Sequence, residues 1–415
     1  MPLRPTGLSH DEIITTLHQM KVNDVRWRDG RAFTLAYSAG EDVLAVAEEA
    51  YRAFGSENAL NTDAFPSLRA IQAQVVDIVV DWLQGDPNAA GFMTSGGTES
   101  ILLAVKASRE RGKKERGITH PNVVLPTSAH AAFEKACYYF GLESRRIAVN
   151  EDWRANPEAM AAAVDDNTVL VVGSAPQYPQ GVIDPIEAIA AIAAERDINC
   201  HVDGCMGGVS LTYLKRLGYA IPAWNFEVPG VTSISVDLHK YGYTAKGASV
   251  IAYRSKQLRS YQTYVTDNWL GGVYGSSGIM GTKGGGSMAA AWAVMNFLGD
   301  EGYMRVTLAA RRAAEELVSG VLARPQLQLV AAPDSTLVSF RAADPSTLDV
   351  YAIADGLWKR GWYVDRQGPP PSLHCTVNAI HEGKIAAFLA DLDAVLLELS
   401  GTTSTGTQGA YGTIE

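Results

Sequence analysis

The sequence has few cysteines and no long apolar run, and each shortage excludes a class of protein. Four cysteines occur in 415 residues. None of them forms a CxxC pair, which indicates reduced thiols rather than a disulfide or zinc framework, so we expect no metal site. We expect most of them to act as small buried hydrophobes. No segment approaches the roughly 18 uninterrupted apolar residues of a membrane-spanning helix. The sequence therefore predicts no membrane span.

Basic residues are outnumbered by acidic ones. The formal net charge is −10, and no concentrated Lys/Arg patch is present, which argues against binding to nucleic acid. The N-terminal region has no basic stretch leading into an apolar run, so we predict no signal peptide. The hydrophobic fraction of 47% and the charged fraction of 19% are typical of a globular protein. We therefore expect a soluble, cytoplasmic protein.

Helical and strand patterns alternate along the middle of the chain. A helix at 66–83 is followed by a predicted loop at 85–92, and short apolar runs typical of strands recur at 122–126, 168–174, 199–203, 232–237 and 248–254. This order predicts an α/β fold whose mainly parallel sheet is covered on both faces. The expected divisions are an N-terminal helical arm (1–55), a large domain (56–295), a smaller C-terminal α+β domain (296–400) and a Gly/Thr-rich tail (401–415) that is mobile or ordered only against another surface.

The stretch TSGGTES (94–100) leads directly into an amphipathic helix. Gly96 and Gly97 let the backbone approach a ligand closely, and the free N–H groups of a first helical turn favour an anion such as phosphate. The alternative is an ordinary helix start capped by Ser95 or Thr98, and this motif alone favours that alternative. The stretch has neither the P-loop pattern nor GxGxxG, so it does not indicate a nucleotide site.

Two later stretches place a carboxylate and an amine after predicted strands. INCHVDGCMGG (198–208) ends its strand at Asp203, where a side chain at the carboxyl end of a parallel strand points into a ligand crevice. The alternative is an Asp that bonds its own turn. SISVDLHKYGYTAKGAS (233–249) places Lys240 at a strand end among tyrosines. Burial there, with Lys246 nearby, would make Lys240 a nucleophile, although a single such lysine more often extends its amine to solvent.

Together the three stretches supply what pyridoxal phosphate requires. The helix start at Gly97 would hold the phosphate, Lys240 would bind the cofactor covalently, and Asp203 would keep the ring nitrogen protonated. His130, in PTSAHAAFEKA, is an aromatic that could lie on the ring face. Taken alone, His130 is more often a structural histidine.

These motifs, with WRDGRAFTLAYSAGE (27–41), NWLGGVYGS (268–276) and GTKGGG (281–286), resemble the sphingosine-1-phosphate lyases of the group II pyridoxal-phosphate decarboxylase superfamily. The resemblance covers more than half of the chain. It implies a type I fold like that of aspartate aminotransferase and a homodimer whose active sites lie at the subunit interface. It also implies a role in sphingolipid metabolism, in which a phosphorylated long-chain base is cleaved between C2 and C3 into phosphoethanolamine and a fatty aldehyde.

The resemblance also implies a role for each matching position. Lys240 would carry the cofactor, Asp203 would pair with its ring nitrogen and His130 would stack on the ring. Tyr178, in PQYPQG, would lie near the reacting atoms, and either Lys240 or Tyr178 would transfer the protons. The positions implied for the cofactor phosphate are Gly97, Thr98, His239 and, from the neighbouring subunit, Thr282. The positions implied for the substrate and its phosphate are Tyr37, Asn58 and Lys246.

Two positions depart from the family pattern. Asn61 stands in ENALNTDAFP where the family commonly has His, and Lys283 stands in GTKGGG where the family commonly has Arg. A neutral amide and a point charge hold a phosphate less tightly than the groups they replace. The substrate phosphate is therefore the part of the function that the motifs support least.

Two other readings of the sequence stay open. A pyridoxal-phosphate amino-acid decarboxylase, or an aldolase for a smaller amino alcohol, would use the same Lys240 and Asp203. A binding protein that has kept the fold and lost the reaction is the third reading, and the joint presence of Lys240, Asp203 and His239 argues against it.

Overall fold

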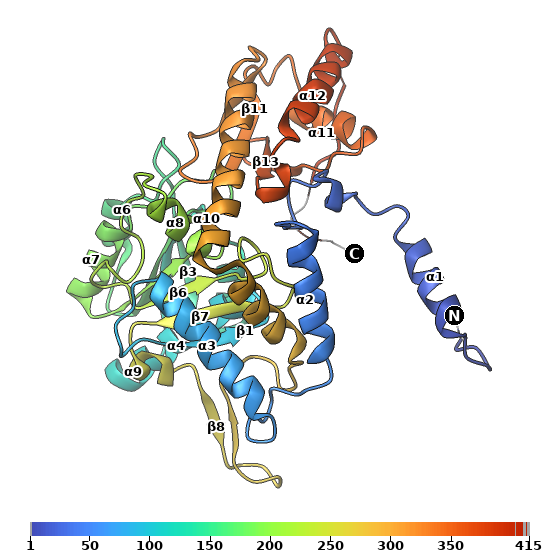
Figure 1. Ribbon diagram of the computed structural model, residues 1–415. Helices are drawn as coiled ribbons and strands as arrows, with labels where there is room; N and C mark the ends of the chain where they lie inside the picture. Colours follow the sequence, from blue (N-terminus) through green and yellow to red (C-terminus); the bar gives the residue numbers. More distant parts are fainter. Residues whose placement is uncertain (1, 403, 410–411, 413–415) are drawn as a thin grey trace.

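The structure is a computed structural model that describes residues 2–402, 404–409 and 412. Its large part is built on a seven-stranded sheet with the order β1-β7-β6-β5-β4-β2-β3 (Figure 1). The five strands from β6 to β3 run parallel, and β7 pairs antiparallel with both β6 and β1. This confirms a mainly parallel sheet. The strands are β1 (Ala90–Thr94), β2 (Asn122–Pro126), β3 (Glu143–Ile147), β4 (Thr168–Ser174), β5 (Asn199–Asp203), β6 (Ser233–Val236) and β7 (Ser249–Tyr253).

Helices cover both faces of this sheet, which explains why its central strands are buried along their whole length. Side chains alternate between the two faces of a strand. In β2, Val123 and Leu125 pack with the helices that contain Ile101 and Phe133, whereas Val124 belongs to the core on the opposite face. The helices of the large part are α3 (Pro66–Trp82), α4 (Gly97–Arg116), α5 (Ala132–Phe140), α6 (Pro157–Ala163), α7 (Ile186–Arg196), α8 (Gly207–Arg216) and α9 (Lys256–Ser260).

A second, smaller core lies at the far end of the long helix α10 (Gly286–Leu322), which is interrupted by the left-handed backbone of Gly299 (Figure 1). It contains a four-stranded antiparallel sheet of order β10-β11-β13-β12. Phe33, from the predicted N-terminal arm, belongs to this core and stacks on His381. The elements are β10 (Leu327–Leu329), β11 (Leu337–Ala342), α11 (Val350–Lys359), β12 (Asp365–Gln367), β13 (Ser372–Thr376) and α12 (Ile385–Leu399).

Two segments project from the body of the chain in Figure 1. The first projection is helix α1 (His10–Met20), which buries none of its residues. Helix α2 (Glu41–Ala53), by contrast, buries Val43 and Ala47. A hairpin of β8 (Tyr264–Thr266) and β9 (Tyr274–Ser276) forms the other projection, and Trp269 and Leu270 at its tip are exposed. No helix in the described part of the chain is both long enough and apolar enough to cross a membrane.

The loop predicted at 85–92 is partly wrong, because β1 begins at Ala90. Ala90 and Gly91 have low strand propensity, so the start of this strand leaves little local signal. It forms because it pairs with β7, where a side-chain carbon on Gly91 would lie 3.0 Å from the carbonyl oxygen of Ile251. The partner strand, which is distant in sequence, therefore decides the structure of this segment.

Two described residues of the Gly/Thr-rich tail, Gly406 and Thr407, bond side chains at the start and in the middle of α11. The N–H of Gly406 donates to Asp349 (2.8 Å), and the N–H of Thr407 donates to Asp355 (2.9 Å). The rest of the predicted tail, residues 403, 410–411 and 413–415, lies outside the described residues. The division of the chain at 295/296 stays a prediction, and that position falls inside α10.

Candidate active site

Lys240 lies in a turn beyond the end of β6 and lines a cavity of about 450 Å³. The prediction of a lysine at the strand end was wrong. β6 ends at Val236, and the chain then turns so that the N–H of His239 donates to the carbonyl of Ala248 (3.1 Å) just before β7. Eight residues predicted for the site nevertheless line this one cavity, namely Gly97, Thr98, His130, Tyr178, Asp203, His239, Lys240 and Lys246.

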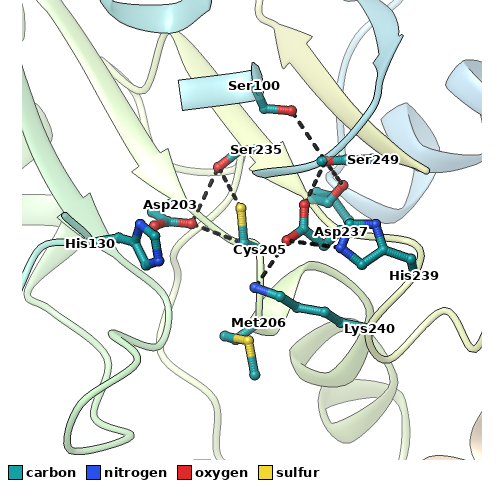
Figure 2. A network of polar contacts seen from close by, with 12 residues as sticks. Ser100, His130, Asp203, Cys205, Met206, Ser235, Asp237, His239, Lys240 and Ser249 are labelled. Carbon is teal, nitrogen blue, oxygen red and sulfur yellow. Dashed lines mark hydrogen bonds and ion pairs between the residues drawn. The ribbon is translucent and has the colours of Figure 1, made fainter. Parts of the chain in front are cut away.

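A buried carboxylate that the sequence reasoning missed pairs with Lys240. Nζ of Lys240 lies 3.0 Å from Oδ2 of Asp237, whose side chain is only 2% exposed (Figure 2). Burial by itself raises the pKa of Asp237, but Lys240 and His239 reverse this effect, so the pKa lies below its ordinary value. The hydroxyl of Ser249 donates to Oδ1 of Asp237 (2.6 Å). The prediction that Lys240 lies in an apolar, aromatic pocket is therefore incomplete, because the carboxylate of Asp237 lies beside its ammonium.

Asp203 ends β5 as predicted and is buried at the wall of the same cavity. Its Oδ1 accepts hydrogen bonds from the N–H of Cys205 (3.0 Å) and the hydroxyl of Ser235 (3.3 Å). The first of these bonds is the turn contact of the alternative reading, so Asp203 forms its own turn and faces the cavity as well. His130 lies beside Asp203 in Figure 2. Burial lowers the pKa of His130, and its Nδ1 accepts from the N–H of Ala132 (3.1 Å), which favours the neutral ring.

Helix α4 begins at Gly97 without a side-chain cap, which contradicts the alternative reading of Ser95 or Thr98 as a cap. Ser95 instead donates both its N–H (2.7 Å) and its hydroxyl (2.8 Å) to Oε2 of Glu99, another cavity residue that the sequence reasoning missed. The first-turn N–H groups of α4 therefore meet the cavity without a capping side chain. Among the described residues, none provides a hydrogen-bond partner for the buried Nδ1 of His239, which lines the same cavity.

Gly97 has no room for a side chain. A carbon added there would lie 2.7 Å from Sγ of Cys205 and 2.8 Å from Oδ2 of Asp237. We expect Gly97→Ala to lower the free energy of unfolding by about 1–3 kcal/mol, because the carboxylate that pairs with Lys240 would have to move. Urea unfolding measures this difference. Gly96→Ala is the matched control, since its added carbon would lie 3.5 Å from His239, and an equal loss in both variants would contradict the prediction.

Tyr37 and Lys246, both predicted to contact substrate, lie beside each other, and of the two only Lys246 lines the cavity. Nζ of Lys246 lies 4.8 Å from the centre of the Tyr37 ring and donates to the carbonyl of His239 (3.3 Å). Although Lys246 as a residue is exposed, desolvation at its ammonium, and then the charge of Lys240, lower its pKa to about 8. The predicted proximity of the two lysines is therefore present.

The remaining predicted residues do not line this cavity within one chain. Asn58 and Asn61 accept backbone N–H groups in their own turns, from Leu60 (2.9 Å) and Asp63 (2.9 Å) respectively. Thr282 is exposed. The resemblance places Thr282 at the active site of a neighbouring subunit, so this assignment stays a prediction.

Lys283 extends its ammonium inward, where it donates to the carbonyl of Met93 and lies 4.8 Å from the centre of the Phe92 ring. Burial lowers its pKa to about 8, against the opposing effect of Glu99. The unfolded chain therefore binds more protons than the native one between about pH 8 and the ordinary lysine value near 10.4, and stability rises with pH over that range. We expect the difference in unfolding free energy, parent minus Lys283→Met, to grow from pH 8 to pH 10. Urea unfolding at both values tests this, and a constant difference would rule the effect out.

Tyr178 lines a second cavity as well, of about 880 Å³, which also shares His130 with the first. The ring of Tyr178 packs on His374 with 4.2 Å between ring centres. Its hydroxyl lies 3.0 Å from Asp365 at the start of β12 and 3.2 Å from Thr34. Tyr178 therefore contacts both the small core and the N-terminal segment.

Comparisons with known proteins match most of the chain. The pyridoxal-dependent decarboxylase conserved domain matches residues 4–343. The chain is 38% identical to the sphingosine-1-phosphate lyase of Oryza sativa subsp. japonica, over 94% of this chain and 73% of that protein. It is 36% identical to sphingosine-1-phosphate lyase 1 of Rattus norvegicus, over 97% of this chain and 71% of that protein. The chain belongs to the sphingosine-1-phosphate lyase family of pyridoxal-dependent decarboxylases.

Solved structures agree with this assignment. The sphingosine-1-phosphate lyase of Burkholderia pseudomallei matches with a TM-score of 0.91 and 37% identity, covering 96% of this chain and 92% of that one. The glutamate decarboxylase of Lactobacillus brevis, at 19% identity, shares the fold with a TM-score of 0.85, covering 98% of this chain and 96% of that one. The predicted type I fold of pyridoxal-phosphate enzymes is therefore confirmed.

The residues of the smaller cavity fit pyridoxal phosphate, the cofactor of this family. The buried Nδ1 of His239 and the uncapped start of α4 at Gly97 suit a phosphate. Figure 2 shows Asp203 and His130 on one side of the cavity and His239 on the other, with Lys240 between them. This order provides an anion-binding end, an amine and a buried carboxylate in one enclosure.

Proposed function

We propose that this chain is a pyridoxal-phosphate-dependent aldehyde-lyase that cleaves the C2–C3 bond of a phosphorylated sphingoid base. The products are phosphoethanolamine and a long-chain aldehyde. The observation that carries the proposal is the identity of 36–38% with relatives named sphingosine-1-phosphate lyase over most of the chain. The cavity that holds Lys240, Asp203 and His239 together supplies the chemistry.

When bound, pyridoxal phosphate supplies a ring that accepts electrons from the bond being broken. Lys240 would hold the group through its amine, inside the cavity that the substrate amine must enter. Asp203 is the buried carboxylate that would keep a proton on the ring nitrogen, while His239 and the first turn of α4 would hold the phosphate. Tyr178 or Lys240 removes the proton of the C3 hydroxyl, and both line the same cavity.

The phosphate of the substrate needs a cation, and Lys246 is the one we propose. Lys246 lines the cavity next to Tyr37, whereas Lys283 extends its ammonium to the carbonyl of Met93. Asn61 replaces the histidine common in the family. Fewer groups therefore assist Lys246 in holding the phosphate than in relatives that have the histidine. We therefore propose a preference for phosphorylated over unphosphorylated bases that depends mainly on Lys246.

We also propose a cytoplasmic homodimer with active sites shared between the subunits. The hairpin tip exposes Trp269, Leu270 and Val273, and α1 exposes Ile14 and Leu17. Apolar side chains gathered on projecting elements favour burial against another surface, and a second copy would complete the site with its Thr282. Four free, buried thiols are compatible with a reducing compartment. Sedimentation velocity of the purified protein tests the dimer, and a monomer at micromolar concentration would contradict it.

The decisive experiment incubates the cofactor-loaded protein with dihydrosphingosine phosphate, its unphosphorylated analogue and a panel of amino acids. We expect aldehyde release from the phosphorylated base and no carbon dioxide from any amino acid. Carbon dioxide without aldehyde would identify an amino-acid decarboxylase instead. If neither product forms and borohydride fails to trap cofactor on Lys240, the chain is a binding protein instead.

A further inference from the structure

Tyr178 is held at its hydroxyl by two residues from outside the large domain. Oδ2 of Asp365 lies 3.0 Å from the hydroxyl, and Oγ1 of Thr34 lies 3.2 Å from it. A phenol has one proton to donate, and an ionised carboxylate can only accept. With Asp365 ionised, Tyr178 therefore donates to Asp365, and the hydroxyl of Thr34 donates to the phenol oxygen. In this arrangement the phenolic proton lies between Tyr178 and Asp365.

Asp365 is set in place by the small sheet. It begins β12 and pairs across the sheet with His374, whose ring packs on Tyr178 at 4.2 Å. Burial lowers the pKa of His374 to about 3, so this ring is neutral near pH 7. It therefore forms no ion pair with the Asp365 carboxylate in place of the hydrogen bond from Tyr178. Neither Asp365 nor Thr34 is used in the proposed reaction, although both contact a residue that lines the cavity of Lys240.

We propose that Asp365 is a positioning residue that acts through Tyr178, accepting the phenolic proton when Tyr178 takes the proton of the substrate C3 hydroxyl. This inference rests on the proposed function and answers which residue acts as the base. The substrate O–H bond breaks as a new O–H bond forms on Tyr178, and the original phenolic proton bonds to Oδ2 of Asp365. The negative charge thereby moves from Asp365 to the substrate oxygen. When C2–C3 breaks, an electron pair on that oxygen completes the aldehyde carbonyl, and the C2–C3 pair stays with the C2 fragment.

The groups around Asp365 are compatible with a carboxyl that gains and loses a proton. Burial raises the pKa of Asp365, while the hydrogen bond from Tyr178 and the charge of Arg366 oppose that shift. Tyr363 and Cys375 also face this carboxylate, and its charge contributes to raising both of their pKa values. A carboxyl with a raised pKa accepts a phenolic proton at a smaller cost than an ordinary one. Arg366 itself is paired with Asp355 (2.5 Å).

The test compares Asp365→Asn with the parent enzyme in aldehyde release from dihydrosphingosine phosphate. Asn keeps an acceptor for the Tyr178 hydroxyl but cannot take its proton. We expect kcat to fall about 100-fold, within the range of general acid–base catalysis, with KM changed little. In the parent, kcat/KM should fall on the acidic side as Asp365 becomes protonated, and this limb should be absent in Asp365→Asn. Thermal unfolding and the absorbance of bound cofactor check that the variant is folded and loaded.

A double-mutant comparison separates this role from a structural one. If Asp365 acts through Tyr178, Asp365→Asn should cost little further activity in a Tyr178→Phe background. Asp393→Asn is the matched control, because Asp393 pairs with Arg324 (2.6 Å) and its side chain is 60% exposed. Unchanged kcat and pH profile in Asp365→Asn, or losses that multiply in the double variant, would overturn the inference. If the parent releases no aldehyde, the proposed function fails instead, so the two failures are distinguishable.

Discussion

Lys240→Arg is expected to abolish turnover while the protein stays folded. A guanidinium remains protonated at all working pH values and cannot condense with an aldehyde, yet it can still pair with the carboxylate of Asp237. The variant should release no aldehyde and should lack the visible absorbance of covalently held cofactor. Its thermal midpoint should stay close to that of the parent.

Lys240→Ala separates the chemical role of this residue from its structural role. It should lose turnover equally, but it leaves Asp237 buried without its ammonium partner, which costs about 3 kcal/mol. Urea unfolding of the two variants measures the difference. Measurable turnover by either variant would refute the assignment of Lys240, and equal stability of the two would show that the ion pair contributes little.

Asp237→Asn is expected to have the largest effect on stability. Asp237 is buried and joins Lys240 (3.0 Å) to Ser249 (2.6 Å), so its neutralisation leaves an ammonium without its carboxylate. Breaking such a pair costs about 3–5 kcal/mol. Ser249→Ala removes the hydroxyl contacts with Asp237, the carbonyl of Val236 and Ser100 and should cost about 1–2 kcal/mol. Urea unfolding at neutral pH gives both values.

The pH dependence of this loss follows from the lowered pKa of Asp237. A carboxyl whose native pKa lies below its unfolded value stabilises the fold above about pH 4, and the stabilisation is lost as the pH falls through the native pKa. The difference between parent and Asp237→Asn should therefore stay constant from pH 8 to pH 5 and shrink below pH 4. Asp24→Asn, at an exposed position, controls for the change in net charge. A difference that persists below pH 3 would mean that the amide disturbs packing rather than charge.

Much of the site could be predicted because its residues follow strands in short, specific motifs. Asp203, His130, Gly97 and Lys240 come from four separate stretches, yet the carboxyl ends of parallel strands and the helix starts beside them meet at one edge of a sheet. Asp237 carried nearly the same signal as Asp203, since Asp203 is the last residue of the buried strand β5 and Asp237 directly follows the buried strand β6. Strands β5 and β6 pair in parallel and bring both carboxylates to the same cavity.

Other features had no local signal. Glu99 belongs to the helix that follows the glycines. Only the fold shows that its carboxylate accepts hydrogen bonds from Ser95 and from the N–H of Ile279 (2.8 Å). Asp365 lies far from Tyr178 in sequence, and neither residue predicts the other. Strand β1 depends on its pairing with β7 rather than on its own composition.

The amino-acid sequence by itself determined the alternation of helices and strands, the mainly parallel sheet and the set of groups that suits pyridoxal phosphate, because periodicity, turn residues and short motifs act over a few neighbouring positions. The tertiary structure alone decided that Lys240 pairs with Asp237, that Lys283 extends its ammonium to the carbonyl of Met93, and that a carboxylate of the small sheet reaches Tyr178. These contacts join residues from different turns and sheets, and their energies depend on burial and distance, which exist only once the chain has folded.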